Sequence, residues 1–242
     1  MVDLELYGAV TLPVWGQFVE ILRAVLTLLI SLTGSPGLAI ILFTVAIRAL
    51  LVPLAVYSHR ANQRMQALKP KLEKLQRRYR HDRQKLSVET MRLYRENQIN
   101  PYATILPALI QIPLLIGLYQ SITAVAATGM QGFLWLPSLA HADPWHLLPL
   151  LAALFQLVQA RMALPSAQAL PLDAQQQLMR QLTQVLPLTA LAFGWVAAAG
   201  LALYWATQAA FGATQQYFLT GWGALRDWFP ILPEDRHTSP PA

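Results

Sequence analysis

Long apolar stretches separated by short polar breaks dominate the pattern of the sequence. Residues 37–57 form a run of 21 residues with a single charge, Arg48, and about 20 apolar residues are enough for a helix to cross a bilayer. Four further apolar stretches follow, at roughly 103–126, 145–163, 183–198 and 200–219. The pattern therefore predicts an all-α integral membrane protein with five transmembrane helices.

An earlier apolar stretch, residues 14–33, carries polar side chains on one side. Gln17, Glu20 and Arg23 recur every three residues, so they form a polar stripe on a helix. Such a helix favours the plane of the membrane interface over a spanning position. We predict an N-terminal interfacial helix, which the Gly-Ser-Pro-Gly sequence at 34–37 then ends.

The polar segment at residues 59–98 is strongly basic. It holds 16 of the 30 charged side chains, twelve of them Lys or Arg and four Asp or Glu, for a net charge of +8. Apolar positions spaced 3-4-3-4 form a heptad seam along its first half: Met65, Leu68, Leu72, Leu75 and Tyr79. We expect a turn at 81–83 and a second helix at 86–96. The segment is therefore predicted to be a cytoplasmic antiparallel helical hairpin of the coiled-coil type.

The other 202 positions hold only 14 charged residues, about 7%, whereas an ordinary soluble domain has roughly 25%. So few charges exclude a soluble enzyme of this size. The absence of cysteine excludes disulfides and thiolate-ligated metals. Nearly all Lys and Arg fall in segments predicted to share one side of the membrane. The positive-inside rule then puts the N-terminus outside and the C-terminus in the cytoplasm.

These signals divide the chain into consecutive segments. They are an N-terminal segment with the interfacial helix (1–35), transmembrane helix 1 (36–58), the basic hairpin (59–99), transmembrane helix 2 (100–126), an external loop (127–144), transmembrane helix 3 (145–163), a cytoplasmic loop (164–182), transmembrane helices 4 and 5 (183–219) and a short cytoplasmic tail (220–242). We expect the tail to be frayed, because it is short and rich in proline.

Arg48 is the most informative single residue. It is twelfth in its 21-residue span, about 16 Å of helix from the start at 1.5 Å per residue. A guanidinium at that depth is costly unless it meets water or a counter-charge, and the predicted spans contain no Asp or Glu. This favours a wet cavity inside the membrane. The alternative is an arginine that snorkels or binds backbone carbonyls, one of which Pro53 could free.

Further polar side chains in the spans are candidates to line such a cavity. Thr44 lies one turn before Arg48. The others are glutamines: Gln111 in the second span, Gln156 and Gln159 in the third, and Gln208, Gln215 and Gln216 in the fifth. Each alone is typical of hydrogen bonding between helices, and that interpretation stays open. Their common relation to one uncompensated cation favours a hydrophilic groove.

Signatures of catalysis are absent from the sequence. The five histidines are scattered without ligand spacing, and no HExxH, GxSxG or glycine-rich phosphate loop is present. We therefore expect no enzyme activity, no metal and no cofactor. A secondary transporter fits poorly, since five spans are few and no paired halves are visible. An anion or small-solute pore lined by Arg48 is the alternative function, and a purely structural assembly factor is the third.

Several stretches resemble one known family, in the right order along residues 14–222. GLAIILFTVAIRALLVPL at 37–54 resembles the first core span of the YidC/Oxa/Alb insertase family, with its central arginine and following proline. MQALKPKLEKLQRRY at 65–79 is similar to the start of the family's cytoplasmic hairpin, and NPYATILPALIQIPLLIGLY at 100–119 to its next span. FLWLPSLAHADPWHLLPLL at 133–151 is similar to its outer loop with the third span, and AAGLALYWATQAAFGATQQYFL at 198–219 to its last span.

This resemblance implies a membrane protein insertase and chaperone of the five-span bacterial form without a large periplasmic domain. Such proteins move hydrophobic segments of nascent membrane proteins into the bilayer without ATP, and their five spans enclose a hydrophilic groove. By resemblance, Arg48 is the groove arginine. Further client-contacting positions implied by the resemblance are Thr44, Gln159, Tyr204 and Trp205. The polar pattern of the spans adds Gln111, Gln156 and Gln208 as candidate groove residues.

The resemblance also implies a location and a set of partners. The location is the bacterial inner membrane, as a multi-pass protein. The implied partners are nascent client proteins and the lipid bilayer, and beyond them the Sec translocon, the ribosome and the signal recognition particle machinery. No DNA partner is expected, because topology accounts for the basic segment.

Overall fold

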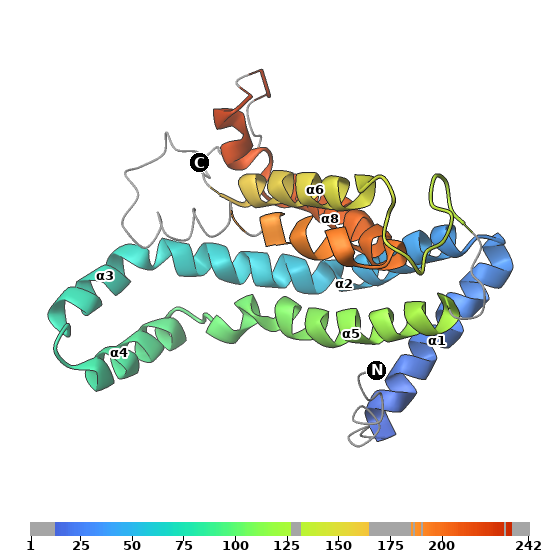
Figure 1. Ribbon diagram of the computed structural model, residues 1–242. Helices are drawn as coiled ribbons and strands as arrows, with labels where there is room; N and C mark the ends of the chain where they lie inside the picture. The colour runs from blue at the N-terminus through green and yellow to red at the C-terminus, as the bar shows by residue number, and fades with distance from the viewer. Residues whose placement is uncertain are drawn as a thin grey trace. The chain divides into compact units, whose positions relative to one another are not determined.

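The computed structural model describes residues 13–126, 132–164, 185, 187–189, 191–229 and 231–233, and these are almost entirely helical (Figure 1). Within these ranges the extended pairing is confined to an isolated bridge between Phe133 and Leu136. The prediction of an all-α protein is confirmed. The chain forms two compact units, which we call the core unit (Met1–Ala49 with Ile116–Ala242) and the hairpin unit (Leu50–Leu115).

The described helices can be compared with the predicted segments, although part of the fourth predicted span (183–198) lies outside the described residues. The elements are α1 (Pro13–Thr33), α2 (Pro36–Ala67), α3 (Lys69–Arg78), α4 (Arg83–Glu96), the 3₁₀ turn η2 (Pro101–Thr104), α5 (Leu106–Ala126), α6 (Leu147–Ala163), α8 (Ala199–Thr220) and the 3₁₀ turn η3 (Gly223–Asp227). A short apolar helix at Pro187–Val196 precedes α8. Most of the predicted cytoplasmic loop at 164–182 lies outside the described residues.

Helix α1 confirms the helix predicted at 14–33. It ends where Gly34 takes a φ of +65°, a conformation that glycine adopts without strain. Thr33 Oγ1 donates to Leu29 O at 2.7 Å in the last turn. α1 is long and apolar enough to cross a membrane. Its interfacial position therefore stays a prediction.

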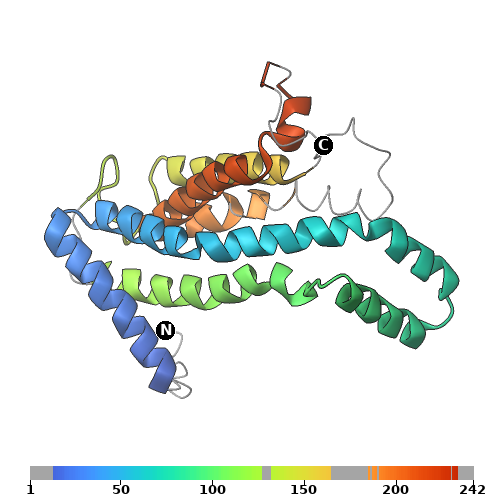
Figure 2. The ribbon, with the colours of Figure 1, turned by 180° about the vertical axis from the view of Figure 1, so that it is seen from behind.

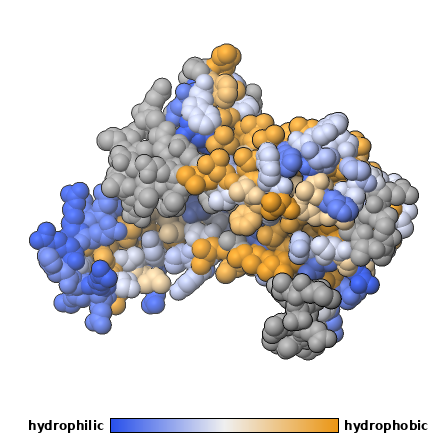
Figure 3. Space-filling model, in the orientation of Figure 1, coloured by the Kyte–Doolittle hydropathy of each residue, from blue (hydrophilic) through white to orange (hydrophobic). Residues whose placement is uncertain are grey.

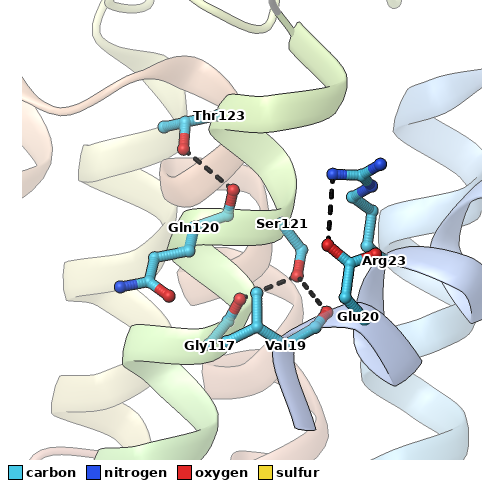
Figure 4. Close-up of polar contacts among 7 residues, drawn as sticks. All are labelled: Val19, Glu20, Arg23, Gly117, Gln120, Ser121 and Thr123. Carbon is cyan, nitrogen blue, oxygen red and sulfur yellow. Dashed lines mark hydrogen bonds and ion pairs between the residues drawn. The ribbon is translucent and has the colours of Figure 1, made fainter. Parts of the chain in front are cut away.

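Within the core unit, α1 packs against the second half of α5. The Ser121 hydroxyl lies 2.8 Å from Gly117 O in its own helix and 3.3 Å from Val19 O in α1 (Figure 4). Glu20 and Arg23, two members of the predicted polar stripe, form an exposed ion pair at 3.4 Å. The α1–α5 contact thus includes the small polar side chain of Ser121, while Glu20 and Arg23 pair within α1.

Helix α2 is longer than the predicted first span. The span was expected to end at residue 58, but α2 continues unbroken to Ala67. Neither glycine nor proline occurs between Leu54 and Ala67, so the sequence that begins the basic segment also continues the helix. The residues of α2 up to Ala49 belong to the core unit.

Helix α8 provides the centre of the core unit. It packs along α6, and ten of its 22 residues are buried. Gly200 allows the close approach, because a Cβ there would lie 2.9 Å from Ile122 Cγ2. From α2, Ala39, Ile40 and Phe43 are also buried. The core is therefore built where the N-terminal part of α2, α5, α6 and α8 meet.

The described helices differ in whether they are long and apolar enough to cross a membrane. Among the described residues, three helices are long and apolar enough to cross a membrane: α1, α2 and the stretch Pro101–Val125. α6 and Pro187–Val196 are apolar but shorter. α8 is long, yet three glutamines interrupt its apolar sequence, which suits a helix packed among others. Five spans and the N-out orientation therefore stay predictions.

The described part of the external loop is tied to the ends of two helices. The backbone N–H groups of Ala199 and Gly200, at the start of α8, donate to His141 O at 2.7 Å and Leu139 O at 2.9 Å. The first N–H groups of a helix have no partner within it. The loop thus satisfies the amino end of α8, and Leu139 is completely buried in the process.

The buried carboxylate of Asp143 organises the rest of this loop. It accepts hydrogen bonds from Trp135 Nε1 at 3.0 Å, Trp145 N at 3.0 Å and Leu148 N at 2.8 Å. Burial by itself raises the pKa of Asp143, but these hydrogen bonds together lower it below its usual value. The carboxylate also sits at the amino end of α6, where negative charge is favourable.

In the hairpin unit, α3 and α4 are joined by a turn and contact each other (Figure 2). Asp82 begins α4, since its side chain accepts a hydrogen bond from Lys85 N at 3.0 Å. The turn lies at 79–81, slightly before the predicted 81–83, and α4 begins three residues earlier than the second helix predicted at 86–96. The coiled-coil seam stays a prediction. Hydrophilic side chains gather over these two helices (Figure 3).

The chain after α8 differs from the frayed tail predicted from residue 220. Ala224 is fully buried and Leu225 is nearly so, and η3 packs against α6. Gly221 and Gly223 both have positive φ, at 71° and 48°, which lets the backbone turn sharply after α8. The proline-rich residues from 234 onward lie outside the described residues.

Candidate functional site

A polar pocket lies in the core unit between α2, α6, α8 and the short helix Pro187–Val196. Its volume is about 200 Å³. Its lining residues come from four separate parts of the chain: Arg48, Ala152, Gln156, Gln159, Thr189, Phe193, Trp205, Gln208 and Ala209. Five of these nine side chains can form hydrogen bonds through a guanidinium, amide or hydroxyl group. None of the described lining residues has a carboxylate.

Arg48 supplies the positive charge of the pocket. It is half-buried on α2, and the buried Tyr204 on α8 interacts with it electrostatically. A tyrosine hydroxyl provides a dipole but no full counter-charge. The pocket therefore presents a cation without a carboxylate among its described lining residues.

The glutamines of α6 give the pocket its hydrogen-bonding groups. Gln156 Oε1 is buried, and it accepts no hydrogen bond from the described residues. Gln159 packs against Gly212 of α8, where a Cβ would lie 2.6 Å from Gln159 Oε1. The missing side chain at position 212 is therefore what makes room for Gln159. A buried acceptor without a partner is costly, and its presence calls for an explanation such as water or a ligand in the pocket.

The structure brings together most of the residues predicted from the sequence. Arg48, Gln159 and Trp205 line the pocket, and so do Gln156 and Gln208. Their roles toward a client stay predictions.

The remaining three predicted site residues lie elsewhere. Thr44 is buried, 2% exposed, and its hydroxyl donates to Ile40 O at 2.6 Å within its own helix. Tyr204 is 2% exposed and interacts electrostatically with Arg48, but it is not among the lining residues of the pocket. Gln111 belongs to the hairpin unit.

Four lining residues were not predicted. Thr189 could have been found, because it is a polar residue within the apolar stretch 183–198. Ala152, Phe193 and Ala209 give no signal in a sequence full of alanine and aromatic residues. No group of three or more His, Asp or Glu side chains that could hold a metal occurs in the described parts of the chain.

Comparison with known proteins identifies the family. A family model described as 60Kd inner membrane protein matches residues 28–223. The chain belongs to this family. The match confirms the resemblance to the YidC/Oxa/Alb insertases, and it includes every residue of the polar pocket.

Named relatives of this YidC-type chain come from several bacteria. The membrane protein insertase YidC 1 of Streptococcus pyogenes serotype M3 is 36% identical over 209 residues, which cover 85% of this chain and 74% of the relative. The membrane protein insertase YidC of Fusobacterium nucleatum is 32% identical over 191 residues, 79% and 89% of the two chains. The membrane protein insertase MisCA of Bacillus subtilis is 34% identical over 214 residues, 86% and 79%.

A solved structure shares the fold of the chain. It is the active YidC insertase crystal structure with the first transmembrane domain resolved, which matches at a TM-score of 0.60 and 22% identity. The match covers 84% of this chain but 46% of the solved one. This chain therefore corresponds to slightly less than half of that larger protein, and the likeness shows a YidC fold.

Proposed function

We propose that this chain inserts client proteins into the lipid bilayer through the polar pocket around Arg48. The insertase names of its relatives and the shared fold support the activity. One observation carries the mechanism: a half-buried arginine faces a pocket with three amides and one hydroxyl, in helices that are otherwise mostly apolar. Such an arrangement is expensive inside a membrane unless water or a polar guest occupies the pocket.

The pocket acts as a temporary host for the polar end of a client. When an acidic tail leaves water, it loses hydration, and the Arg48 guanidinium replaces part of it with a charge-assisted interaction. The amides of Gln156, Gln159 and Gln208 offer both donors and acceptors to the uncharged groups of the tail. The barrier to crossing falls because the tail never faces hydrocarbon alone.

Two forces drive the insertion without ATP. An acidic tail that moves outward gains about 2.3 kcal/mol per charge for each 100 mV of membrane potential. The following apolar segment moves sideways into lipid, with a gain of about 25 cal/mol for each Å² of apolar surface removed from water. No bond is made or broken, so Arg48 acts as an electrostatic host and not as a catalyst.

The same proposal includes the location, the topology and the partners of the chain. The chain resides in a bacterial inner membrane as five spans with the N-terminus outside, and it also assists the folding of its clients. The basic helices α3 and α4 face the cytoplasm and receive the client or its delivery machinery. A Sec translocon, the ribosome and the signal recognition particle are the proposed further partners.

The decisive test is insertion by the purified protein in liposomes. A labelled single-span client with an acidic N-terminal tail is scored for protease protection with wild type, Arg48→Ala, Arg48→Lys and empty liposomes. We expect protection to fall to near the empty-liposome level with Arg48→Ala. Arg48→Lys retains the charge but loses the planar fork, so partial activity is expected. Arg23→Ala, which removes an exposed arginine of α1, is the matched control.

The outcomes separate the proposed function from its alternatives. Full protection with Arg48→Ala rules out the polar pocket as the route for this client. No protection with wild type, together with anion or solute flux across the same liposomes, indicates the pore instead. Activity that appears only when a partner complex is added indicates an assembly factor.

A further inference from the structure

The chain after α8 folds back onto the C-terminal end of α6. We call residues Thr220–Trp228 the C-terminal clasp. Figures 1 and 2 both show it, in red, beside the end of α6. It joins the ends of the two helices that carry most of the polar pocket, since α6 ends at Ala163 and α8 at Thr220.

Hydrogen bonds from the clasp satisfy backbone groups at the end of α6. Thr220 Oγ1 donates to Met162 O at 2.9 Å. Ala224 N donates to Leu164 O at 2.9 Å. The last carbonyls of a helix have no partner within the helix, so these two bonds link α8 and its extension directly to the terminus of α6.

A buried arginine completes the clasp. Arg161, in the last turn of α6, is only 3% exposed. Its guanidinium carbon lies 3.7 Å from the centre of the Trp228 ring, well within the range of a cation–π interaction. A buried guanidinium requires such compensation, and a positive charge suits the carboxyl end of a helix. The contact between Arg161 and Trp228 therefore ties the segment after α8 to the last turn of α6.

Glycine makes the close approach possible. A Cβ on Gly223 would lie 2.3 Å from Met162 O, and the φ of Gly223 is +48°. Any other residue at this position would push the clasp away from α6. Glycine at position 223 thus allows the clasp to lie close to the end of α6.

The clasp lies close to the polar pocket along both helices. Gln159 is two residues before Arg161, and its amide packs against Gly212, eight residues before Thr220. The separation of the two helix ends therefore sets how Gln159 fits between α6 and α8. Side chains packed in this way respond to small shifts of the helices that carry them.

We infer that Arg161 and Trp228 are positioning residues for client insertion: through the clasp they fix the spacing of α6 and α8, and so the shape of the polar pocket. This inference rests on the proposed function. It predicts that opening the clasp slows the clients that use the pocket, although neither residue touches it.

The first readout is the distance between the two helices. The chain has no cysteine, so spin labels at Leu154→Cys on α6 and Thr214→Cys on α8, both exposed in the structure, report the spacing without background. We expect Arg161→Met and Trp228→Leu to broaden and lengthen the distance distribution. Trp228→Phe, which retains an aromatic face, should restore most of it. Trp145→Leu, at an exposed tryptophan of the external loop, is the matched control.

The second readout is insertion of two clients in liposomes, one with an acidic tail that depends on Arg48 and one with a short uncharged tail. Loss of a desolvated cation–π contact should slow the first client roughly threefold or more, and the second much less. A general structural defect would slow both clients equally. The ratio between clients therefore separates positioning from simple loss of protein.

Each outcome decides the inference. Unchanged distances in both clasp variants overturn it, even if a variant inserts poorly. Longer distances with unchanged insertion also overturn it, because the clasp would then be purely structural. If wild type inserts neither client, the proposed function fails, while the distance measurement still shows whether Arg161 and Trp228 hold the helices together.

Discussion

Helices α2, α6 and α8 line two cavities of opposite character within the core unit. The polar pocket contains Arg48 and three glutamines. The other cavity, of about 300 Å³, is lined almost entirely by apolar side chains. On α6, Leu148, Leu151 and Phe155 line the apolar cavity. Ala152, Gln156 and Gln159 line the polar pocket, and positions 152 and 156 each directly follow a lining position of the apolar cavity.

The two cavities differ in whether their polar groups have hydrogen-bond partners. In the apolar cavity, Thr207 Oγ1 donates to Leu203 O at 2.8 Å, and the indole N–H of Trp135 is bound by Asp143. In the polar pocket, by contrast, Gln156 Oε1 is buried without a partner among the described residues. The polar groups named for the apolar cavity thus have hydrogen-bond partners, which favours stability. In the polar pocket, the unpartnered acceptor of Gln156 lowers stability unless a bound guest or water satisfies it.

The largest expected loss of stability comes from a substitution in the lining of the apolar cavity. Leu148 is 3% exposed and lines the apolar cavity, so Leu148→Ala should lower the free energy of unfolding by about 2–5 kcal/mol. Thermal unfolding of the purified protein in detergent measures this loss. Leu154→Ala removes the same atoms from the same helix at a position that is 53% exposed, and it should cost far less. Equal losses would mean that the apolar cavity is not part of the core.

Two glycines of α8 sharpen the comparison further. A Cβ at Gly200 would lie 2.9 Å from Ile122 Cγ2 and 3.3 Å from Leu139 O, so Gly200→Ala should destabilise the protein by about 1–3 kcal/mol. A Cβ at Gly212 would meet only the mobile end of Gln159. We expect Gly212→Ala to unfold near the wild-type temperature but to insert an acidic-tailed client more slowly. Wild-type insertion by Gly212→Ala would show that the place of Gln159 does not matter.

The sequence predicted the polar pocket better than the core around it. A polar residue within an apolar stretch stands out, which is why Arg48, Gln156 and Gln159 were found. Thr44 satisfied the same rule, but its hydroxyl bonds within its own helix. α2 is apolar on nearly all sides, so the pattern cannot show which side faces the pocket. Only the three-dimensional packing decides that Arg48 lines the pocket and that Thr44 is buried.

Long-range contacts explain the remaining differences between sequence and structure. Residues 220–229 are held in place by contacts with α6, more than 50 residues earlier in the chain. The glycines and the tryptophan of this segment do not indicate a packing partner so far away in the sequence. The continuation of α2 to Ala67 was hidden because the change from apolar to basic residues suggested a boundary. A change of environment along a helix is not the end of the helix.

A smaller, pH-dependent loss of stability is expected at Asp143, which binds the indole N–H of Trp135 in the lining of the apolar cavity. The pKa of Asp143 is lowered in the folded protein, so its contribution is present above the pKa of an unfolded aspartate, about 3.9. It is lost as the pH falls through the lowered value. Asp143→Asn should cost about 1–2 kcal/mol at neutral pH and lose less stability than wild type on acidification. Parallel pH profiles of unfolding temperature for the two proteins would contradict this role.

The smallest effect on stability, and the one that best distinguishes the two cavities, is expected from Gln156→Leu. The change removes a buried acceptor that has no partner among the described residues, so stability should stay the same or rise by about 1 kcal/mol. Insertion of an acidic-tailed client should nevertheless fall, because the pocket loses a group that binds the polar tail. The measurement pairs thermal unfolding with protease protection on one preparation. A variant that is both less stable and fully active would show that Gln156 serves packing between helices, and that the polar face of α6 differs from the apolar face in composition only.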